Sequence, residues 1–244
     1  MRARSALTTA AGLGLATMAL NYVPSVVSLG HWLPWRSLPG GWCRWRGPCV
    51  PKVAVTFDDG PSPVTTPRIL DRLDELGLRA TFFCLGLEVD RHPDLVAEIA
   101  HRGHGVATHG YAHERHLART PRWIEADLMR SLSALDRVGV SPRWFRPPYG
   151  QTTLATMTAA RRHHLELVLW SAWGREWTAP DVAEVVARVD RDLAPGTIVL
   201  LHDNDVDSPP GTAQRALDAL GPIAALLERR GLRGVSLDEL VSPS

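Results

Sequence analysis

Short apolar runs alternate with longer amphipathic stretches from residue 52 to the C-terminus. Such runs are typical of buried strands, and amphipathic stretches that end at glycine are typical of helices. The pattern predicts seven strands, at residues 53–57, 80–85, 104–108, 143–146, 165–170, 197–201 and 233–236. It predicts six helices between them, at residues 65–76, 93–102, 121–138, 152–163, 180–193 and 212–230. This alternation predicts an α/β fold with a parallel sheet, closed or open, and with helices outside.

Polar clusters follow five of the predicted strands. They read DDGP, THGYAH, RPPYG, WSAWGREW and HDND, after the first, third, fourth, fifth and sixth strands. All of them lie at C-terminal strand ends, which form the functional face of a (β/α) barrel. Five clusters at one rim are hard to explain as solvated loops. We therefore expect a single active site at this rim.

The first cluster contains two adjacent carboxylates, Asp58 and Asp59, directly after an apolar strand. Like charges at the end of a buried strand repel each other and lose solvation. In extended or turning chain, however, successive side chains diverge. One acid can therefore bind a cation, while the other stays ionised and acts as a base.

The second cluster contains His109 and His113, four positions apart, with His116 three residues later. Gly110 stands where a zincin of the H-E-x-x-H type would need glutamate, so this pair needs a third ligand from elsewhere. Two histidines and one carboxylate, with an open position for water, are typical of a catalytic zinc site. The alternative is that these histidines are exposed or belong to the core.

The third cluster, RPPYG, combines a cation with a rigid turn. Arg146 follows two aromatic residues, so we expect its guanidinium near the core rim and in need of a carboxylate partner. Pro147 and Pro148 lack N–H groups and leave the Tyr149 and Gly150 amides as donors suited to an oxyanion. The alternative is a turn that carries a structural ion pair.

The last cluster begins with His202, directly after the apolar residues 198–201. A histidine at a strand end near a metal can act as a general acid that protonates a leaving amine. It can equally be a fourth ligand or a core residue. Asp203 and Asp205, which follow it, would orient it or remain solvated.

The amino-acid composition indicates a folded domain but says little about its function. Hydrophobic residues make up 45% of the 244 residues, which allows a sizeable core. Lys and Arg number 27 and Asp and Glu number 26, so the formal net charge is +1. This balance offers no electrostatic argument for a nucleic-acid partner. We expect a monomer.

Residues 1–30 differ from the rest of the chain. The basic start MRAR precedes an uncharged stretch that continues to Gly30, a pattern typical of a signal peptide. No clean Ala-x-Ala cleavage site follows, so an uncleaved membrane anchor is the second interpretation, since about 20 residues can span a bilayer. We expect an extracytoplasmic protein, secreted or anchored at the cell envelope. The alternative is an N-terminal helix of a cytoplasmic protein.

Residues 31–51 are rich in Trp, Pro and Gly and show no clear period, which predicts a linker or a segment that wraps around the fold. Cys43 and Cys49 lie in this stretch and would either form a disulfide outside the cytoplasm or remain two thiols. Cys84 lies in an apolar run and is expected to be buried.

The motifs TFDDGP, H-x-x-x-H, RPPYG, a Trp-rich acidic stretch and LLH, in this order, resemble those of the polysaccharide deacetylases: carbohydrate esterase family 4, with its NodB-homology domain. The resemblance assigns residues 52–244 to the catalytic domain. It implies a distorted (β/α) barrel with about seven strands. It also implies removal of acetyl groups from N-acetylated sugars, as in chitin or peptidoglycan, with a divalent metal, commonly Zn²⁺ although other divalent ions also fit.

The resemblance also implies roles for individual residues. The metal ligands would be Asp59, His109 and His113. The catalytic set would be Asp58 as base, His202 as acid, Arg146 as a brace for the base, the Tyr149 N–H in the oxyanion hole, and Glu176. The substrate pocket would include Pro147, Pro148, Trp177 and Leu200, with Leu200 beside the acetyl methyl group.

The sequence departs from the family pattern at two places. Gly110 stands where the family often has Ser or Thr, which removes a hydrogen bond near the metal. The fourth motif reads WGREW, so Trp173 and Glu176 replace the two usual acids. We expect Glu176 to reach Arg146 or His202.

Two other functions remain compatible with the residues. One is a hydrolase of the same fold that acts on a non-polymeric amide or an O-acetyl ester. The other is a non-catalytic barrel that binds glycan, for which the altered fourth motif is the only support.

Overall fold

The computed structural model describes residues 43–242. The predicted leader, residues 1–30, and residues 31–42 of the Trp-rich segment lie outside the described residues. Across residues 43–242, no helix combines the length and the apolar character needed to cross a membrane.

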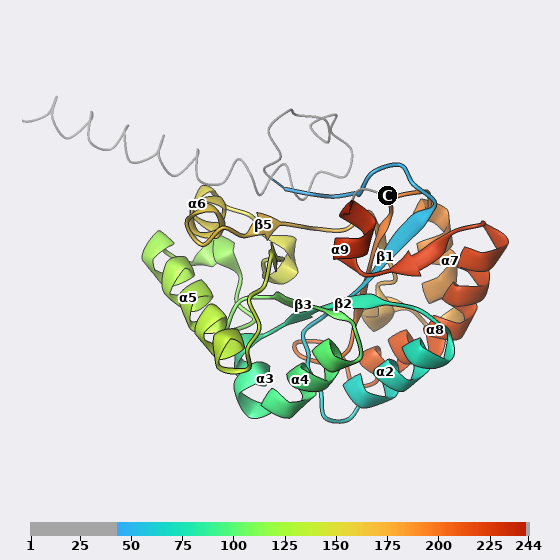
Figure 1. The fold of residues 1–244 in the computed structure, drawn as a ribbon, viewed down its shortest axis with the longest axis horizontal. Coiled ribbons are helices and arrows are strands. Elements are labelled where there is room, and N and C mark those ends of the chain that lie inside the picture. The colour runs from blue at the N-terminus through green and yellow to red at the C-terminus, as the bar shows by residue number, and fades with distance from the viewer. Residues whose placement is uncertain (1–42, 243–244) are drawn as a thin grey trace, which may run out of the picture.

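Strands lie at the centre of the molecule and helices surround them (Figure 1). The strands are β1 (Lys52–Asp58), β2 (Ala80–Cys84), β3 (Gly105–Thr108), β4 (Trp144–Phe145), β5 (Glu166–Leu167), β6 (Ala172–Trp173), β7 (Ile198–His202) and β8 (Arg233–Val235). The α-helices are α2 (Thr66–Glu75), α3 (Gly86–Arg91), α4 (Pro93–His101), α5 (Pro121–Arg137), α6 (Leu154–Arg162), α7 (Val182–Asp192), α8 (Thr212–Arg229) and α9 (Leu237–Val241). Within residues 43–242 there are also three 3₁₀ turns, η2 (His116–Ala118), η3 (Pro148–Gly150) and η4 (Glu176–Thr178).

All seven predicted strands and all six predicted helices are present within residues 43–242, and most of them are shorter than expected. The prediction missed β6, α3 and α9. Each of these has six residues or fewer. Segments of this length show too few turns or alternations to display a period.

The sheet is parallel and runs in the order β5-β4-β3-β2-β1-β7-β6, with β8 paired to the first half of β1. The two ends of this order, β5 and β6, are consecutive in the chain and are separated by residues 168–171 alone. Extended chain of that length spans at most about 17 Å. The sheet therefore curls until its ends nearly meet, and a short piece of chain closes the gap. The distorted (β/α) barrel is confirmed, with one strand more than predicted.

The segment before β1 lies across this gap. Arg44 forms a parallel bridge with Val168, and Arg46 forms an antiparallel bridge with Thr197. Residues 43–51 therefore wrap around the barrel. Cys43 and Cys49 are free thiols, so of the two interpretations the structure has the unpaired one.

Alternation along β1 and β7 decides which side chains face the barrel interior. Val55 and Phe57 of β1 join the outer core, which lies between the sheet and helices such as α2 and α8. Ala54 and Leu200 join the inner cluster together with Ile198. Because side chains alternate between the two faces, the last residues of β1 and β7 also point inward.

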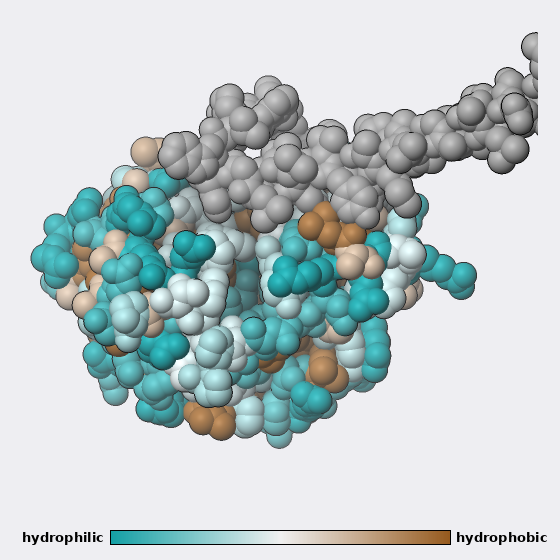
Figure 2. Space-filling view, turned by 180° about the vertical axis from the view of Figure 1, so that it is seen from behind, coloured by the Kyte–Doolittle hydropathy of each residue, from teal (hydrophilic) through white to brown (hydrophobic). Residues whose placement is uncertain are grey.

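The outer surface carries few large apolar side chains. Val64, Met129 and Leu154 are the exposed large hydrophobic residues among those described. On the face shown in Figure 2, hydrophobic residues form small separate spots among hydrophilic ones. A pocket at the strand ends is therefore a better candidate for function than an apolar surface.

Candidate active site

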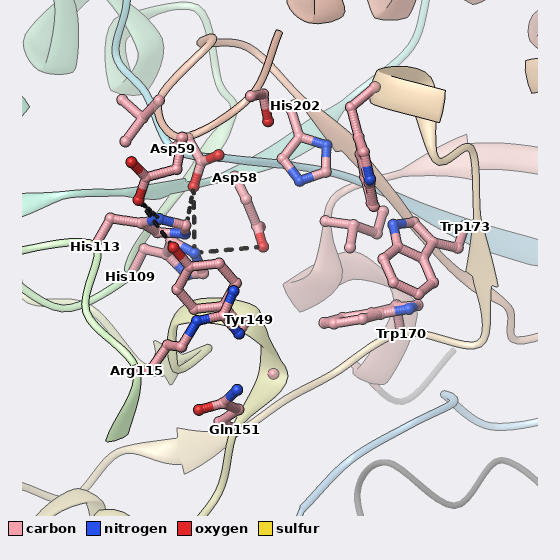
Figure 3. Close-up of a pocket in the computed structure, with 16 residues that line it drawn as sticks. Asp58, Asp59, His109, His113, Arg115, Tyr149, Gln151, Trp170, Trp173 and His202 are labelled. Atoms are coloured by element: carbon pink, nitrogen blue, oxygen red, sulfur yellow. Dashed lines mark hydrogen bonds and ion pairs between the residues drawn. The ribbon is translucent and has the colours of Figure 1, made fainter. Parts of the chain in front are cut away.

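A pocket of about 370 Å³ opens at the C-terminal ends of the strands. Figure 3 shows Asp59, His109 and His113 on one side of it, Trp170 and Trp173 on the other, and His202 between them. The predicted site residues that line the pocket are Asp58, Asp59, His109, His113, Tyr149, Trp177, Leu200 and His202. Arg146 and Glu176 lie behind the wall, fully buried, where each contacts a lining residue.

Asp58 ends β1 and is held from the barrel interior. Its Oδ1 accepts a hydrogen bond of 2.6 Å from Arg146 Nη1, which also donates to Thr56 Oγ1 at 2.9 Å. Arg146 Nη2 donates to the Leu169 carbonyl oxygen at 2.9 Å. The buried guanidinium therefore has the carboxylate partner that burial of a cation requires. These bonds leave Oδ2 of Asp58 facing the pocket, 3.8 Å from His109 Nε2.

Asp59 turns the other way. It has a positive φ of 79°, so the chain bends immediately after Asp58 and the two carboxylates diverge. Asp59 Oδ1 lies 3.4 Å from His109 Nε2 and 3.3 Å from His113 Nε2, and it is buried with no hydrogen-bond partner. Burial would raise the pKa of Asp59, but the neighbouring histidines, His109 first, lower it.

These three groups fit a divalent cation. Ligands on a tetrahedral ion with bonds of about 2.0–2.2 Å lie about 3.3–3.6 Å apart, which matches the two distances from Asp59 Oδ1. The second ring nitrogens are occupied: His109 Nδ1 bonds the Arg146 carbonyl oxygen at 2.7 Å, and His113 Nδ1 bonds Asp207 Oδ2 at 2.9 Å. Both Nε2 lone pairs are therefore available on the side of Asp59. Asp59, His109 and His113 form a candidate metal site.

The loop between the two histidines depends on Gly110. This residue has φ +83°, and a Cβ there would lie 2.9 Å from Asp127 Oδ2. The Asp127 carboxylate accepts hydrogen bonds from the backbone N–H groups of Tyr111 and Ala112 at 2.9 and 3.0 Å. The turn that brings His113 beside His109 is thus stabilised by Asp127 and needs a residue without a side chain. His116 points elsewhere and bonds Thr156 Oγ1.

Gly60, in the first motif, is another position where a side chain would clash with a buried carboxylate. A Cβ there would lie 2.1 Å from Oδ2 and 2.4 Å from Oδ1 of Asp203, which is buried. Asp203 accepts a hydrogen bond of 2.5 Å from Thr66 Oγ1, and burial raises the pKa of its carboxyl to about 7. Asp203 therefore packs under the motif and does not orient His202.

His202 has a carboxylate partner in Glu176. Its Nδ1 lies 3.4 Å from Glu176 Oε2, and its backbone N–H donates to Glu176 Oε1 at 3.1 Å. Burial alone would lower the pKa of His202, but the charge of Glu176, with smaller effects from Asp59 and Asp58, raises it to about 9. Of the two partners expected for Glu176, the structure pairs it with His202.

The RPPYG turn offers one free amide rather than two. Gly150 N–H donates to the Pro147 carbonyl oxygen at 2.9 Å, which leaves Tyr149 N–H as the candidate oxyanion donor. Tyr149 has φ +58° at the pocket edge. Pro147 and Pro148 are not among the lining residues, because they form the back of the turn and Pro148 packs beside Gly110.

Aromatic side chains form the wall opposite the metal site. The ring centroids of Trp170 and Trp173 are 5.1 Å apart, as are those of Trp173 and Trp177. Trp177 meets the His202 ring edge to face at 5.2 Å. Together with Leu200, they enclose an apolar space beside His202.

Sequence reasoning missed six lining side chains. These are Arg115, Gln151, Trp170, Val206, Asp207 and Ser208. Arg115 lies two residues after the cluster THGYAH, Asp207 lies two residues after HDND, and Trp170 is the first residue of WSAWGREW, so these three had a sequence signal in or beside the motifs. Nothing in the sequence indicates which of the other loop residues turn inward.

The family comparison agrees with the site. A family model described as polysaccharide deacetylase matches residues 46–168. A peptidoglycan-N-acetylglucosamine deacetylase of Bacillus cereus is 34% identical over 207 residues, which is 83% of this chain and 94% of the relative. A chitooligosaccharide deacetylase of Bradyrhizobium sp. is 33% identical over 199 residues, or 77% and 90% of the two chains.

A solved structure has the same fold and the same barrel. It is a peptidoglycan N-acetylglucosamine deacetylase crystallised with an N-oxidanyl-benzamide compound; the TM-score is 0.79, the identity is 30%, and the match covers 87% of this chain and 99% of that one. The chain therefore belongs to the polysaccharide deacetylases, the hydrolases of carbohydrate esterase family 4 that carry the NodB domain.

Proposed function

We propose that this enzyme removes N-acetyl groups from N-acetylglucosamine residues of a cell-envelope or chitin-like glycan and releases acetate. The observation that carries the proposal is the division of roles between adjacent acids. Asp58 is held by Arg146 and faces the pocket, while Asp59 faces two histidines. The activities of the two relatives, on peptidoglycan and on chitooligosaccharides, support the same substrate class.

Asp59, His109 and His113 would hold a divalent cation, for which Zn²⁺ is the first choice. Such an ion supplies a Lewis acid for the acetyl carbonyl and for the attacking water. The chain itself orients both imidazoles, because each Nδ1 bonds an oxygen of the protein.

Asp58 acts as the general base. Oδ1 is occupied by Arg146 and Oδ2 is directed into the pocket, so Oδ2 accepts the proton of the attacking water. Arg146, which is itself held by Thr56 Oγ1, restrains rotation of the carboxylate during this transfer. Arg146 is therefore a positioning residue and does not itself meet the substrate.

His202 acts as the general acid from the opposite side. With a pKa raised to about 9, it is protonated at neutral pH and can donate its proton to the leaving nitrogen. Tyr149 N–H donates a hydrogen bond to the developing oxyanion. Leu200 and Trp177 surround the acetyl methyl group. The products are acetate and a free amino sugar.

We also propose an extracytoplasmic location, since the signal-like pattern of residues 1–30 and an envelope glycan as substrate both favour it. The test of function is acetate release by Zn²⁺-loaded protein from peptidoglycan and from chitooligosaccharides, measured side by side. Release from either glycan supports the proposal. Turnover of small acetyl amides or esters alone would contradict it.

A further inference from the structure

The loop after β7 reaches back to the metal site through Asp207. One oxygen of this residue, Oδ2, accepts hydrogen bonds from His113 Nδ1 and from Tyr149 Oη, both at 2.9 Å. The two donors come from the loops after β3 and after β4, and their ring centroids are 4.4 Å apart. Figure 3 shows these two rings side by side below Asp59. A single carboxylate oxygen therefore joins three loops.

The rest of this loop is fixed to the barrel by other side chains. Asp205 accepts from the backbone N–H groups of Gly211 and Ala213, both at 2.7 Å, at the start of α8. Asn204 Nδ2 donates to the Asp59 carbonyl oxygen at 3.3 Å. Asp207 itself has φ +51°, in the left-handed region, where Asp occurs more often than most other non-glycine residues. This bend directs its carboxylate to His113 and Tyr149.

The two candidate metal histidines are oriented in different ways. His109 Nδ1 bonds the Arg146 carbonyl oxygen, a neutral group that is fixed by the strand behind it. His113 Nδ1 bonds a negatively charged carboxylate that is 94 positions away and more than half exposed. A carboxylate partner keeps the proton on Nδ1 and makes Nε2 a stronger ligand. The loop that carries Asp207 also supplies Val206 and Ser208 to the pocket wall.

We propose that Asp207 is a positioning residue that sets the cation affinity of this site through His113 and ties the pocket wall at Val206 and Ser208 to the metal centre. The inference rests on the proposed function for the presence of a divalent cation. It adds a residue that acts on the ligand and does not contact the cation.

The predicted effect is a loss of cation affinity. Removal of a partner of this kind typically weakens metal binding by about 10–100-fold, and we expect that range for Asp207→Ala. Asp207→Asn keeps one acceptor oxygen, so its Zn²⁺ affinity should fall only several-fold, which is less than the fall in Asp207→Ala. Tyr149→Phe removes the second hydrogen bond and leaves the first, so its Zn²⁺ affinity should stay within a few-fold of that of the wild type.

The experiment is calorimetric titration of the metal-free full chain with Zn²⁺, with Co²⁺ absorption spectra as a second readout. Asp205→Asn is the matched control, because it lies on the same loop, keeps an acceptor for α8 and does not contact a histidine. Weaker binding and an altered Co²⁺ spectrum in Asp207→Ala, with Asp205→Asn unchanged, support the inference. Binding by Asp207→Ala equal to wild type overturns it, as does an equal loss in Asp205→Asn.

The inference can still be tested if Asp207→Ala does not fold or if the wild-type protein is inactive. If Asp207→Ala does not fold, the same titration of Asp207→Asn decides, with several-fold weaker binding in support and unchanged binding against. If the wild-type protein binds Zn²⁺ but releases no acetate from either glycan, the proposed function fails. A reduced affinity in Asp207→Ala would then still support the inference about Asp207.

Discussion

Asp58 and His202 are register partners on the adjacent parallel strands β1 and β7. Both are the last residues of their strands, and alternation places both side chains on the inner face of the barrel. The proposed base and the proposed acid are thus held by backbone hydrogen bonds rather than by flexible loops. This rigid pair is separated from Asp59, which leaves the strand at a positive φ and faces the histidines.

Replacement of Asp58 by Asn should strongly slow catalysis while Zn²⁺ remains bound. The amide oxygen can still accept from Arg146, but it cannot take a proton from water, so we expect kcat to fall by about 10²–10⁴-fold. Acetate release and Zn²⁺ content measure the two effects. Asp58→Ala is a poorer probe, because it leaves Arg146 buried without a carboxylate and should cost about 3–5 kcal/mol of stability. A fully active Asp58→Asn protein would assign the base elsewhere.

Replacement of Asp59 by Ala should instead weaken Zn²⁺ binding. It removes the one oxygen ligand between His109 and His113, so Zn²⁺ affinity should fall by more than the roughly 10–100-fold expected for residues that only orient a ligand. Titration calorimetry with Zn²⁺ measures this loss. Wild-type affinity in Asp59→Ala would remove Asp59 from the metal site.

Glu176→Gln should shift the alkaline limit of activity to lower pH. The negative charge of Glu176 raises the pKa of His202 above its usual value, and a neutral Gln removes that effect. The general acid must be protonated, so activity would be lost at a lower pH as His202 deprotonates. The pH dependence of kcat with Zn²⁺ saturating tests this. An unchanged alkaline limb together with normal folding would mean that His202 is not the acid.

Gly60→Ala should destabilise the protein through a clash with Asp203. The added Cβ would lie 2.1 Å from Asp203 Oδ2, and overpacking of this kind typically costs about 1–3 kcal/mol. The cost should shrink when Asp203 is also changed to Ala, which removes the clashing oxygens. Urea unfolding of the two single variants and the double variant gives their coupling. Strictly additive losses would show that the clash is relieved by other movements.

The barrel can be predicted from the sequence because local patterns determine its strands and helices. Apolar runs, glycine stops and the position of each polar cluster after a strand required no knowledge of distant contacts. Parallel strands bring their C-terminal ends to one rim, so strand order alone predicts that Asp58, His109 and His202 lie together. The exceptions, β6, α3 and α9, are too short to show a period.

The choice of partners within that rim could not be read in the same way. Glu176 could have reached Arg146 or His202, and the amides of Tyr149 and Gly150 looked equally free. These questions depend on how loops bend, through the positive φ angles of Tyr149 and Asp207, and on where each loop lands.

Local sequence pattern therefore predicts the kind of fold, the rim that carries the chemistry and the residue types gathered there. The tertiary structure alone decided that Glu176 serves His202, that Asp203 packs beneath Gly60, and that Asp207 holds His113 across 94 positions of chain. The physical reason is the difference in sequence separation between the two kinds of interaction. Periodicity acts over a few neighbouring residues, whereas these hydrogen bonds exist only after the sheet has curled and brought distant loops together.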